Sequence, residues 1–380
     1  MSNRHRPARP RPGPPGSSSA DEEPLRLRLH EPGELVAAVP HLLGFRPVAS
    51  LVLVAVHDDL GGASGRRRLG VVARADLPAP GDVAAVVGAC ATRMVPTGPT
   101  EVTAVVVAEG PDDAPDDAPD DAPEDAGAPP RTDVADTVGS VFAGHGIVAP
   151  TRLWVPRIAA GAPWRCYPPC DCRGRVAATD DSPLAAASAW LGQVTYESRA
   201  ALEASLAPGP PHPRLAELVD AEWEAAVLDR ELGGPAAARR DLAAVAAARD
   251  EVAAGRPLGD GELARLAVAL ADPGVRDVVM GWALADEGVA VAAEQLWTLL
   301  VRALPAPEVA EPAVLLACAQ LVRGGSALVG VALERARRAD PGHRLAGLLE
   351  SLLASGAGPD AVRTVIREAS TESAARLRAG

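Results

Sequence analysis

The sequence contains no lysine, so all 37 of its Lys/Arg residues are arginines. A phosphate-binding P-loop, a Schiff-base enzyme and a kinase-type ATP site each depend on a lysine amine, and the sequence excludes these classes. The G-x-S-x-G, H-E-x-x-H and G-x-G-x-x-G motifs and the calcium-loop pattern are also absent. No residue is therefore predicted to be catalytic, and no motif predicts a cofactor.

Cysteine is scarce as well. Five cysteines, an odd number in a chain of 380 residues, do not form the disulfide framework of a secreted domain. The sequence has no apolar run long enough to span a bilayer, and its N-terminus is rich in arginine and proline rather than apolar as in a signal peptide. These absences predict a cytoplasmic protein that has no membrane partner.

Charge is concentrated in two segments of low complexity. Residues 111–130 hold eight carboxylates and no base, so the net charge of −13 becomes −5 without them. We expect a disordered acidic insert over residues 109–131 and a disordered, arginine- and proline-rich tail over residues 1–24, because neither segment can bury a core. The mildly acidic remainder argues against nucleic acid as the default partner.

An α/β pattern begins after the tail. Leucines alternate with polar residues over residues 25–29, which predicts a strand. A helix is expected over residues 32–43, with Gly44 as its left-handed cap and Pro40 implying a kink or a break. The nearly unbroken apolar run at residues 50–56 is typical of a strand covered on both faces.

The pattern continues to residue 205. Further strands are predicted at residues 69–77, hairpinned to the preceding strand, at 102–107, and at 152–158, the last at a sheet edge because it contains Pro156. Helices are predicted at residues 83–94, capped by Asp82, at 133–144 and at 182–192. Strands that alternate with helices, together with one hairpin, predict a mixed sheet with helices packed on it over residues 25–205.

No strand pattern follows residue 206. A Pro/Gly linker over residues 206–214 leads into successive helix candidates whose short junctions are typical of antiparallel helical hairpins. These candidates are residues 215–232, 235–254, 261–270, 275–285, 289–304, 312–322, 327–339, 343–354 and 360–376. The predicted fold class is therefore an α/β domain with a mixed sheet, followed by an all-α helical array over residues 206–380.

Five segments carry a more specific pattern. They are PHLLGFRPVASLVLV at residues 40–54, ARADLP at 73–78, VRDVVMGW at 275–282, LWTLLVRALP at 296–305, and LLACAQLVRGGSALVGVALERARRADPGHRLAGLLE at 315–350. Together they resemble the actinobacterial domain-of-unknown-function family 4192. The resemblance covers most of the chain outside the tail and the acidic insert. It implies an organisation and a bacterial source, but no activity.

The last of these segments can also be compared with a helical repeat. When Pro341 is placed at the terminal proline of a tetratricopeptide unit, favoured positions fall on Leu316, Ala317, Gly324, Leu333 and Ala336. No second copy follows at the same period. A weakly tetratricopeptide-like array and simple packing of α-hairpins both account for the pattern.

Polar residues gather where the first helix turns into the second strand. His41, Arg46 and Ser50 flank this turn, and Arg74 and Asp76 end the strand that should lie beside it. Ligands of open α/β sheets bind beyond the strand ends, where an arginine could clamp a carboxylate or a phosphate. The alternative is structural: the arginines pair with Asp76 or cap helix carbonyls, and His41 is a partly buried histidine with its hydrogen bonds satisfied.

Three cysteines lie close together in the proline-rich stretch PWRCYPPCDCRGR. Cys166, Cys170 and Cys172 could bind zinc as thiolates, with Asp171 or a distant histidine as the fourth ligand. Their C-x3-C-x-C spacing differs from the paired C-x2-C knuckles of familiar zinc sites. It also differs from the adjacent Cys-Cys-Pro run of the family that the chain resembles. Reduced thiols in a loop are therefore the alternative.

Two functions from different classes remain. The first is a protein-interaction or scaffold/regulatory module that binds an unknown protein partner on the concave surface of the helical array. The second is a small-ligand-binding or enzymatic α/β domain that holds an anionic ligand at the corner formed by Arg46, Arg74 and Asp76. An unpaired arginine in a deep pocket at that corner would favour the second function, and internal pairing of both arginines would remove its main support.

Overall fold

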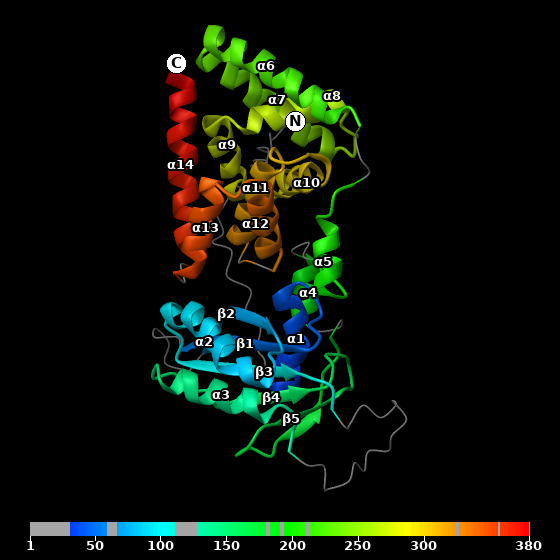
Figure 1. Cartoon of the computed structure of the whole chain (residues 1–380), viewed down its shortest axis with the longest axis vertical. Helices are drawn as coiled ribbons and strands as arrows, with labels where there is room; N and C mark the ends of the chain where they lie inside the picture. Colours follow the sequence, from blue (N-terminus) through cyan, green and yellow to red (C-terminus); the bar gives the residue numbers. More distant parts are fainter. Residues whose placement is uncertain are drawn as a thin grey trace, which may run out of the picture.

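The computed structural model describes residues 31–58, 67–110, 128–179, 183–190, 194–209, 213–323, 325, 327–355 and 358–379. The predicted tail, the predicted strand at residues 25–29 and most of the acidic insert lie outside these ranges. An N-terminal mixed sheet with helices is followed by a helical region, α6–α14 (Figure 1). The predicted fold class is confirmed.

The sheet has six strands in the order β2-β1-β3-β4-β5-β6. Their bounds are Ser50–Asp58 for β1, Arg67–Asp76 for β2, Glu101–Val107 for β3, Arg152–Val155 for β4, Pro163–Cys166 for β5 and Arg173–Arg175 for β6. Strand β1 is antiparallel to β2 and to β3, whereas β3 and β4 are parallel. Strands β5 and β6 form an antiparallel hairpin on β4.

Strand β1 is covered on both faces, as its apolar run predicts. Because successive side chains of a strand point to opposite faces, Leu51 and Leu53 lie in one core and Val52 and Val54 in another. The first core contains α2 (Val83–Met94) and α3 (Thr132–Ala143), and the second contains α1 (Pro32–Leu43). The sheet therefore lies between two layers of helices.

Two local predictions for this half are wrong, those for the edge position of β4 and for the cap by Asp82. Strand β4 is not an edge strand, because it ends at Val155, before Pro156, and β5 pairs with its other side. Helix α1 is not broken at Pro40, and Gly44 caps it with a φ of 80° as predicted. Asp82 precedes α2, but its side chain makes no capping hydrogen bond.

The second half of the chain is helical, and no strand occurs beyond residue 206 in its described part. Its helices are α6 (Leu215–Gly233), α7 (Pro235–Ala253), α8 (Asp260–Leu270), α9 (Pro273–Met280), α10 (Glu287–Ala303), α11 (Ala310–Val322), α12 (Ala327–Ala339), α13 (Arg344–Ala354) and α14 (Pro359–Ala379). Among the helices that the structure describes, none is both long and apolar enough to cross a lipid bilayer.

Helix α5 (Arg199–Ser205) lies between the two halves (Figure 1). Leu202 on α5 and Leu206 just after it are both 2% exposed, and they belong to the apolar core shared by α1 and the helical half. The linker then contacts the helical half, since the backbone N–H of Gly209 donates to the carbonyl of Arg302 at 2.8 Å. Apolar packing and this backbone contact therefore connect the sheet to the helices.

Candidate functional site

The corner predicted from the sequence forms, and a distant segment covers it. The backbone N–H of Arg46 donates to the carbonyl of Tyr196, and the N–H of Tyr196 donates to the carbonyl of Gly44. His41 lies 3.0 Å from the Thr195 hydroxyl through Nδ1 and 3.0 Å from the carbonyl oxygen of Thr179 through Nε2. Since a carbonyl can only accept, Nε2 carries the proton and Nδ1 accepts from the hydroxyl.

Both arginines of the corner form ion pairs with carboxylates. Arg46 Nε lies 3.7 Å from the Glu197 carboxylate. Arg74 pairs with Asp76 at 2.6 Å, donates from Nε to the Ser50 hydroxyl at 2.9 Å, and lies over the Phe45 ring. The buried Ser50 hydroxyl in turn donates to the carbonyl of Val48. These contacts are the ones that the structural alternative requires, so they remove the main support for an anion clamp at this corner.

We expect Arg74→Gln to lower the free energy of unfolding by about 1–2 kcal/mol, because it removes a hydrogen bond from a charged donor to a buried hydroxyl. The measurement is urea denaturation of the full chain. Asp76→Asn is the control: this carboxylate is 86% exposed, and its loss should cost no more than about 1 kcal/mol. Unchanged stability of the Arg74 variant would show that this side chain does not hold the turn.

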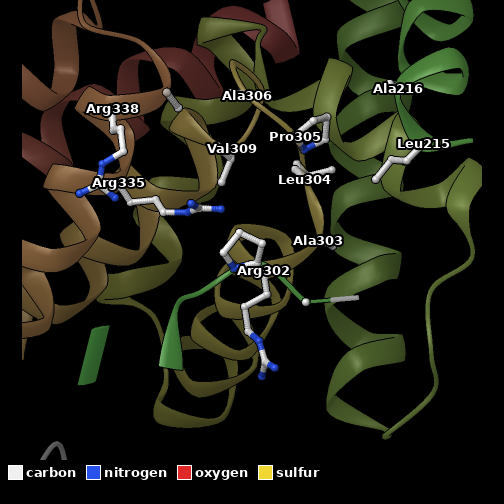
Figure 2. A pocket seen from close by; sticks show the side chains of 13 residues that line it. Leu215, Ala216, Arg302, Ala303, Leu304, Pro305, Ala306, Val309, Arg335 and Arg338 are labelled. Atoms are coloured by element: carbon white, nitrogen blue, oxygen red, sulfur yellow. The ribbon is translucent and has the colours of Figure 1, made fainter. Parts of the chain in front are cut away.

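A cavity of about 450 Å³ lies in the helical half, beside the linker. Its walls come from the end of α10, the loop that follows, the last turns of α12 and the start of α6 (Figure 2). Among the described residues, three arginines line it and no aspartate or glutamate does; the described lining residues are Pro208, Gly209, Leu215, Ala216, Arg302, Ala303, Leu304, Pro305, Ala306, Val309, Arg335, Arg338 and Ala339. The cavity therefore combines an apolar wall with net positive charge.

Arg335 is the central charge of this cavity. Its side chain reaches across the cavity from α12, with Arg338 beside it (Figure 2). Among the described residues no carboxylate pairs with it: its terminal nitrogen donates to the carbonyl of Val301 at 3.4 Å, and its buried Nε has no partner. Burial and the Arg338 cation lower the pKa of the Arg335 guanidinium. An anion placed here would offset both effects.

A second cavity, of about 610 Å³, adjoins the first and shares Gly209, Arg302 and Ala303 with it. Leucine, valine and proline contribute five of its twelve described lining residues: Pro257, Leu258, Leu263, Val291 and Leu299. Its charged groups are Arg302 and a pair formed by Glu294 and Arg323, whose side chains lie 3.6 Å apart. Burial raises the pKa of Glu294, while Arg323 opposes the shift. Together the two cavities form a hollow with apolar walls, and among the described lining residues of each cavity arginines outnumber acidic residues.

The sequence patterns do not predict this hollow. Arg302 belongs to α10, and Arg335 and Arg338 belong to α12, which is separated from α10 in sequence by the loop after α10 and by α11. One signal was present: Arg335 lies between Ala332 and Ala336, which are both fully buried, on the inward side of α12. An arginine next to the buried stripe of a helix needs a partner or an opening to solvent.

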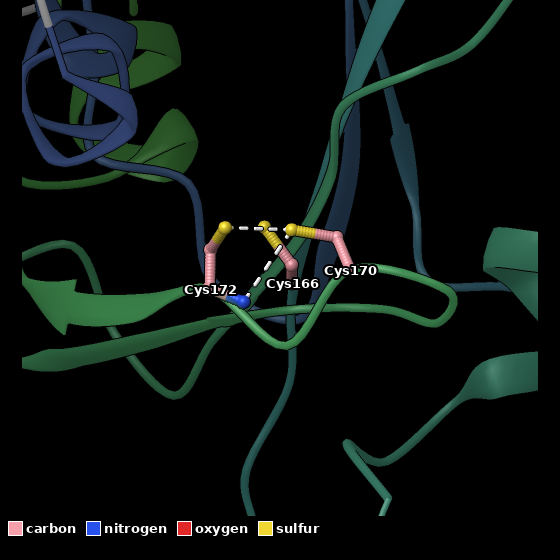
Figure 3. Close-up of side chains that lie close together, drawn as sticks. All are labelled: Cys166, Cys170 and Cys172. Carbon is pink, nitrogen blue, oxygen red and sulfur yellow. Dashed lines mark hydrogen bonds between the residues drawn. The ribbon is translucent and has the colours of Figure 1, made fainter.

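The structure brings the three predicted cysteines together. Cys166 ends β5, and Cys170 and Cys172 lie in the turn before β6, so the cysteines sit on a β-hairpin rather than in an irregular loop (Figure 3). All three sulfur atoms lie within 4.8 Å of one another. Within the described residues, no histidine or carboxylate joins this group. Asp171, one of the two kinds of fourth ligand predicted, is therefore not part of this group, and among the described residues a distant histidine is not part of it either.

The three thiols shift one another's pKa. Burial, followed by the neighbouring thiols, raises the pKa of Cys166 to about 12. The hydrogen bond between the Cys170 and Cys172 thiols lowers the pKa of Cys170 and raises the pKa of Cys172. Cys170 is therefore the first of the three thiols to lose its proton as the pH rises.

Comparisons with known proteins identify the family but no relative of known function. Neither a curated protein nor a solved structure matches the chain. The family described as Domain of unknown function (DUF4192) matches residues 32–360. This range spans the sheet, the cysteine hairpin, both cavities and most of the helical half. The chain therefore belongs to the DUF4192 family.

Proposed function

We propose that the protein is a protein-interaction module whose helical half binds an acidic segment of a partner protein. The observation that carries the proposal is Arg335, a half-buried guanidinium without a carboxylate partner among the described residues, in a cavity that contains no acidic side chain. A partner's aspartate or glutamate would supply the missing charge through a bidentate, charge-assisted hydrogen bond.

The shape of the hollow favours a peptide over a compact ligand. Each cavity alone has the volume of a small-molecule site. The two adjoin through Arg302 and Ala303, so an extended chain could place an acidic side chain near Arg335 and apolar side chains against Leu258 and Leu299. Arrays of packed helices bind extended segments on such continuous surfaces. The five cysteines, all free in the structure, accord with a reducing compartment such as the cytoplasm.

The test is selection of binding peptides from a random library displayed on phage, with the full-length protein as target. We expect the selected peptides to share an aspartate or glutamate next to apolar residues. Arg335→Gln should weaken their binding by about 10- to 100-fold, which is the contribution of one hydrogen bond between charged groups. Fluorescence anisotropy with a selected, labelled peptide measures this change.

Arg367→Gln is the matched control, because Arg367 is an exposed arginine on α14 outside both cavities. It removes the same charge and should leave peptide binding unchanged. Selected peptides without acidic residues, or equal affinity for the wild type and the Arg335 variant, would contradict the proposal. Binding of small dicarboxylates together with a failure to select any peptide would contradict it too.

A small-ligand site at the corner of Arg46, Arg74 and Asp76 is the second candidate function, and the contacts favour it less. Both arginines already have carboxylate partners at 3.7 and 2.6 Å. A ligand would have to displace Glu197 or Asp76 before it could pair with either arginine. The helical half offers Arg335 without that competition.

A further inference from the structure

We propose that Cys166, Cys170 and Cys172 bind one zinc ion through three thiolates and leave its fourth position open to solvent. The proposal concerns the sheet-bearing half and is independent of the peptide site. Its basis is geometric: three sulfurs from a single hairpin lie within 4.8 Å of one another (Figure 3). The Cys170 and Cys172 sulfurs lie 2.7 Å apart, so their side chains have to rotate until the sulfurs are about 3.8 Å apart to bind one tetrahedral zinc at zinc–sulfur distances of about 2.3 Å. Clustered thiolates select zinc and other thiophilic metals over magnesium or calcium.

The hairpin brings the three cysteines together without help from a metal. The backbone N–H of Cys166 donates to the carbonyl of Cys172 at 2.8 Å, which closes the turn. Beyond it, Arg165 pairs with Arg173 and Trp164 with Gly174 in the register of the two strands. A Cβ atom at Gly174 would lie only 2.8 Å from the Trp164 ring, so a glycine is needed at this position. A site that is already ordered loses little conformational entropy when the ion binds.

The surroundings decide which kind of zinc site this is. Cys170 is half-buried and Cys172 is exposed, so one side of the sulfur group faces water. No fourth protein ligand is present among the residues that the structure describes. Structural zinc sites use four protein ligands, whereas sites with three keep a position for water or an incoming ligand. The hairpin therefore resembles an open zinc site more than a closed structural one.

Binding is a proton exchange without oxidation or reduction. Three S–H bonds break, three zinc–sulfur bonds form and three protons pass to the solvent, so the ion with its thiolates carries one net negative charge. The exposed Arg173 and the half-buried Arg165, next to the sulfurs on the two strands, would lie near that charge. A water molecule completes the tetrahedron.

The experiment uses the full-length protein purified under reducing conditions. Elemental analysis should find one zinc per chain in the wild type and in the control Cys90→Ala, whose cysteine is buried on α2 far along the chain from the hairpin. Cys170→Ser and Cys172→Ser should contain none. Because backbone hydrogen bonds close the turn, both variants should keep the far-ultraviolet circular dichroism of the wild type, so loss of zinc will not reflect unfolding.

Cobalt replacement distinguishes the open site from its alternatives. Tetrahedral cobalt bound by thiolates should give intense charge-transfer bands, and its visible bands should shift when a small thiol or imidazole is added. Bands that do not respond would contradict the open position. Absence of zinc, equal zinc in the serine variants, or a Cys170–Cys172 disulfide in the reduced preparation would overturn the proposal as a whole.

Discussion

Replacing Trp297 with alanine is expected to lower the free energy of unfolding by about 3–5 kcal/mol. Trp297 is 2% exposed on α10, at the centre of the helical half. Its ring stacks on that of Trp282 with centroids 5.9 Å apart, and Arg249 lies 4.5 Å from the centre of the Trp282 ring. The alanine variant would lose the buried indole, leave a cavity and end the stacking.

Urea denaturation, followed by far-ultraviolet circular dichroism, measures this loss. Trp297→Phe is the matched control, since it retains an aromatic ring in the same place and should cost clearly less than the alanine change. Trp282→Ala should fall between the two, because Trp282 is only half-buried against the same core. A cost below about 1 kcal/mol for Trp297→Ala would mean that the surrounding helices close the cavity, against the tight packing seen here.

Tryptophan also shows where sequence patterns are sufficient. Trp223, Trp282 and Trp297 have leucine, valine or alanine neighbours, a pattern that indicates core residues, and all three lie in or against the second core. The helical periodicity placed α6 to α14 to within a few residues, because a buried stripe on a helix repeats every three or four positions. The sequence also predicts β1 as a buried strand, since its first seven residues are apolar or small and leave no polar face.

Elements that depend on distant partners could not be predicted in this way. Strands β5 and β6 have four and three residues, and PWRC and RGR show no alternation of apolar and polar side chains. β5 forms a strand because it pairs with the edge of β4 that β3 leaves free. β6 in turn pairs with β5. The same reason explains the error at Pro156: the proline follows the ladder instead of interrupting it, so it does not force β4 to the edge.

The candidate sites also differ in whether sequence neighbours or distant residues form them. The three cysteines are near neighbours in sequence, and a turn suffices to bring their sulfurs together. Arg302 and Arg335 lie on different helices, and only the packing of α12 beside the end of α10 makes them line one cavity. At the corner, the residues gathered as predicted, but the partners of His41 and Arg46 come from residues 179 and 195–197, which no local pattern links to them.

The second large effect is expected for Arg276→Met, which should lower the free energy of unfolding by about 3 kcal/mol. Arg276 on α9 bonds to Asp277 at 2.8 Å and lies 3.6 Å from Glu311, at the start of α11. The side chains of all three are less than one-fifth exposed, at 19%, 18% and 18%. Removing the guanidinium would leave two carboxylates in a poorly solvated place.

Few other groups would stabilise the Glu311 carboxylate after the Arg276 guanidinium is removed. One of its oxygens is buried without a hydrogen-bond partner, and the other lies 3.3 Å from Nε2 of His343, the residue that caps α13. The N-terminus of α11 gives some support to a negative charge. Arg276 is nonetheless the permanent cation of the group, so its contribution should appear mainly as coupling to Glu311.

A double-mutant cycle measures this coupling. Glu311→Gln removes the charge that Arg276 neutralises, so the double variant should be more stable than the sum of the two single losses implies, by about 1–3 kcal/mol. Urea denaturation of the four proteins gives the coupling free energy. Strictly additive losses would mean that Arg276 acts through Asp277 alone. In that case the charged group would not link α9 to α11, and apolar packing around Trp297 would have to account for the contact between these helices.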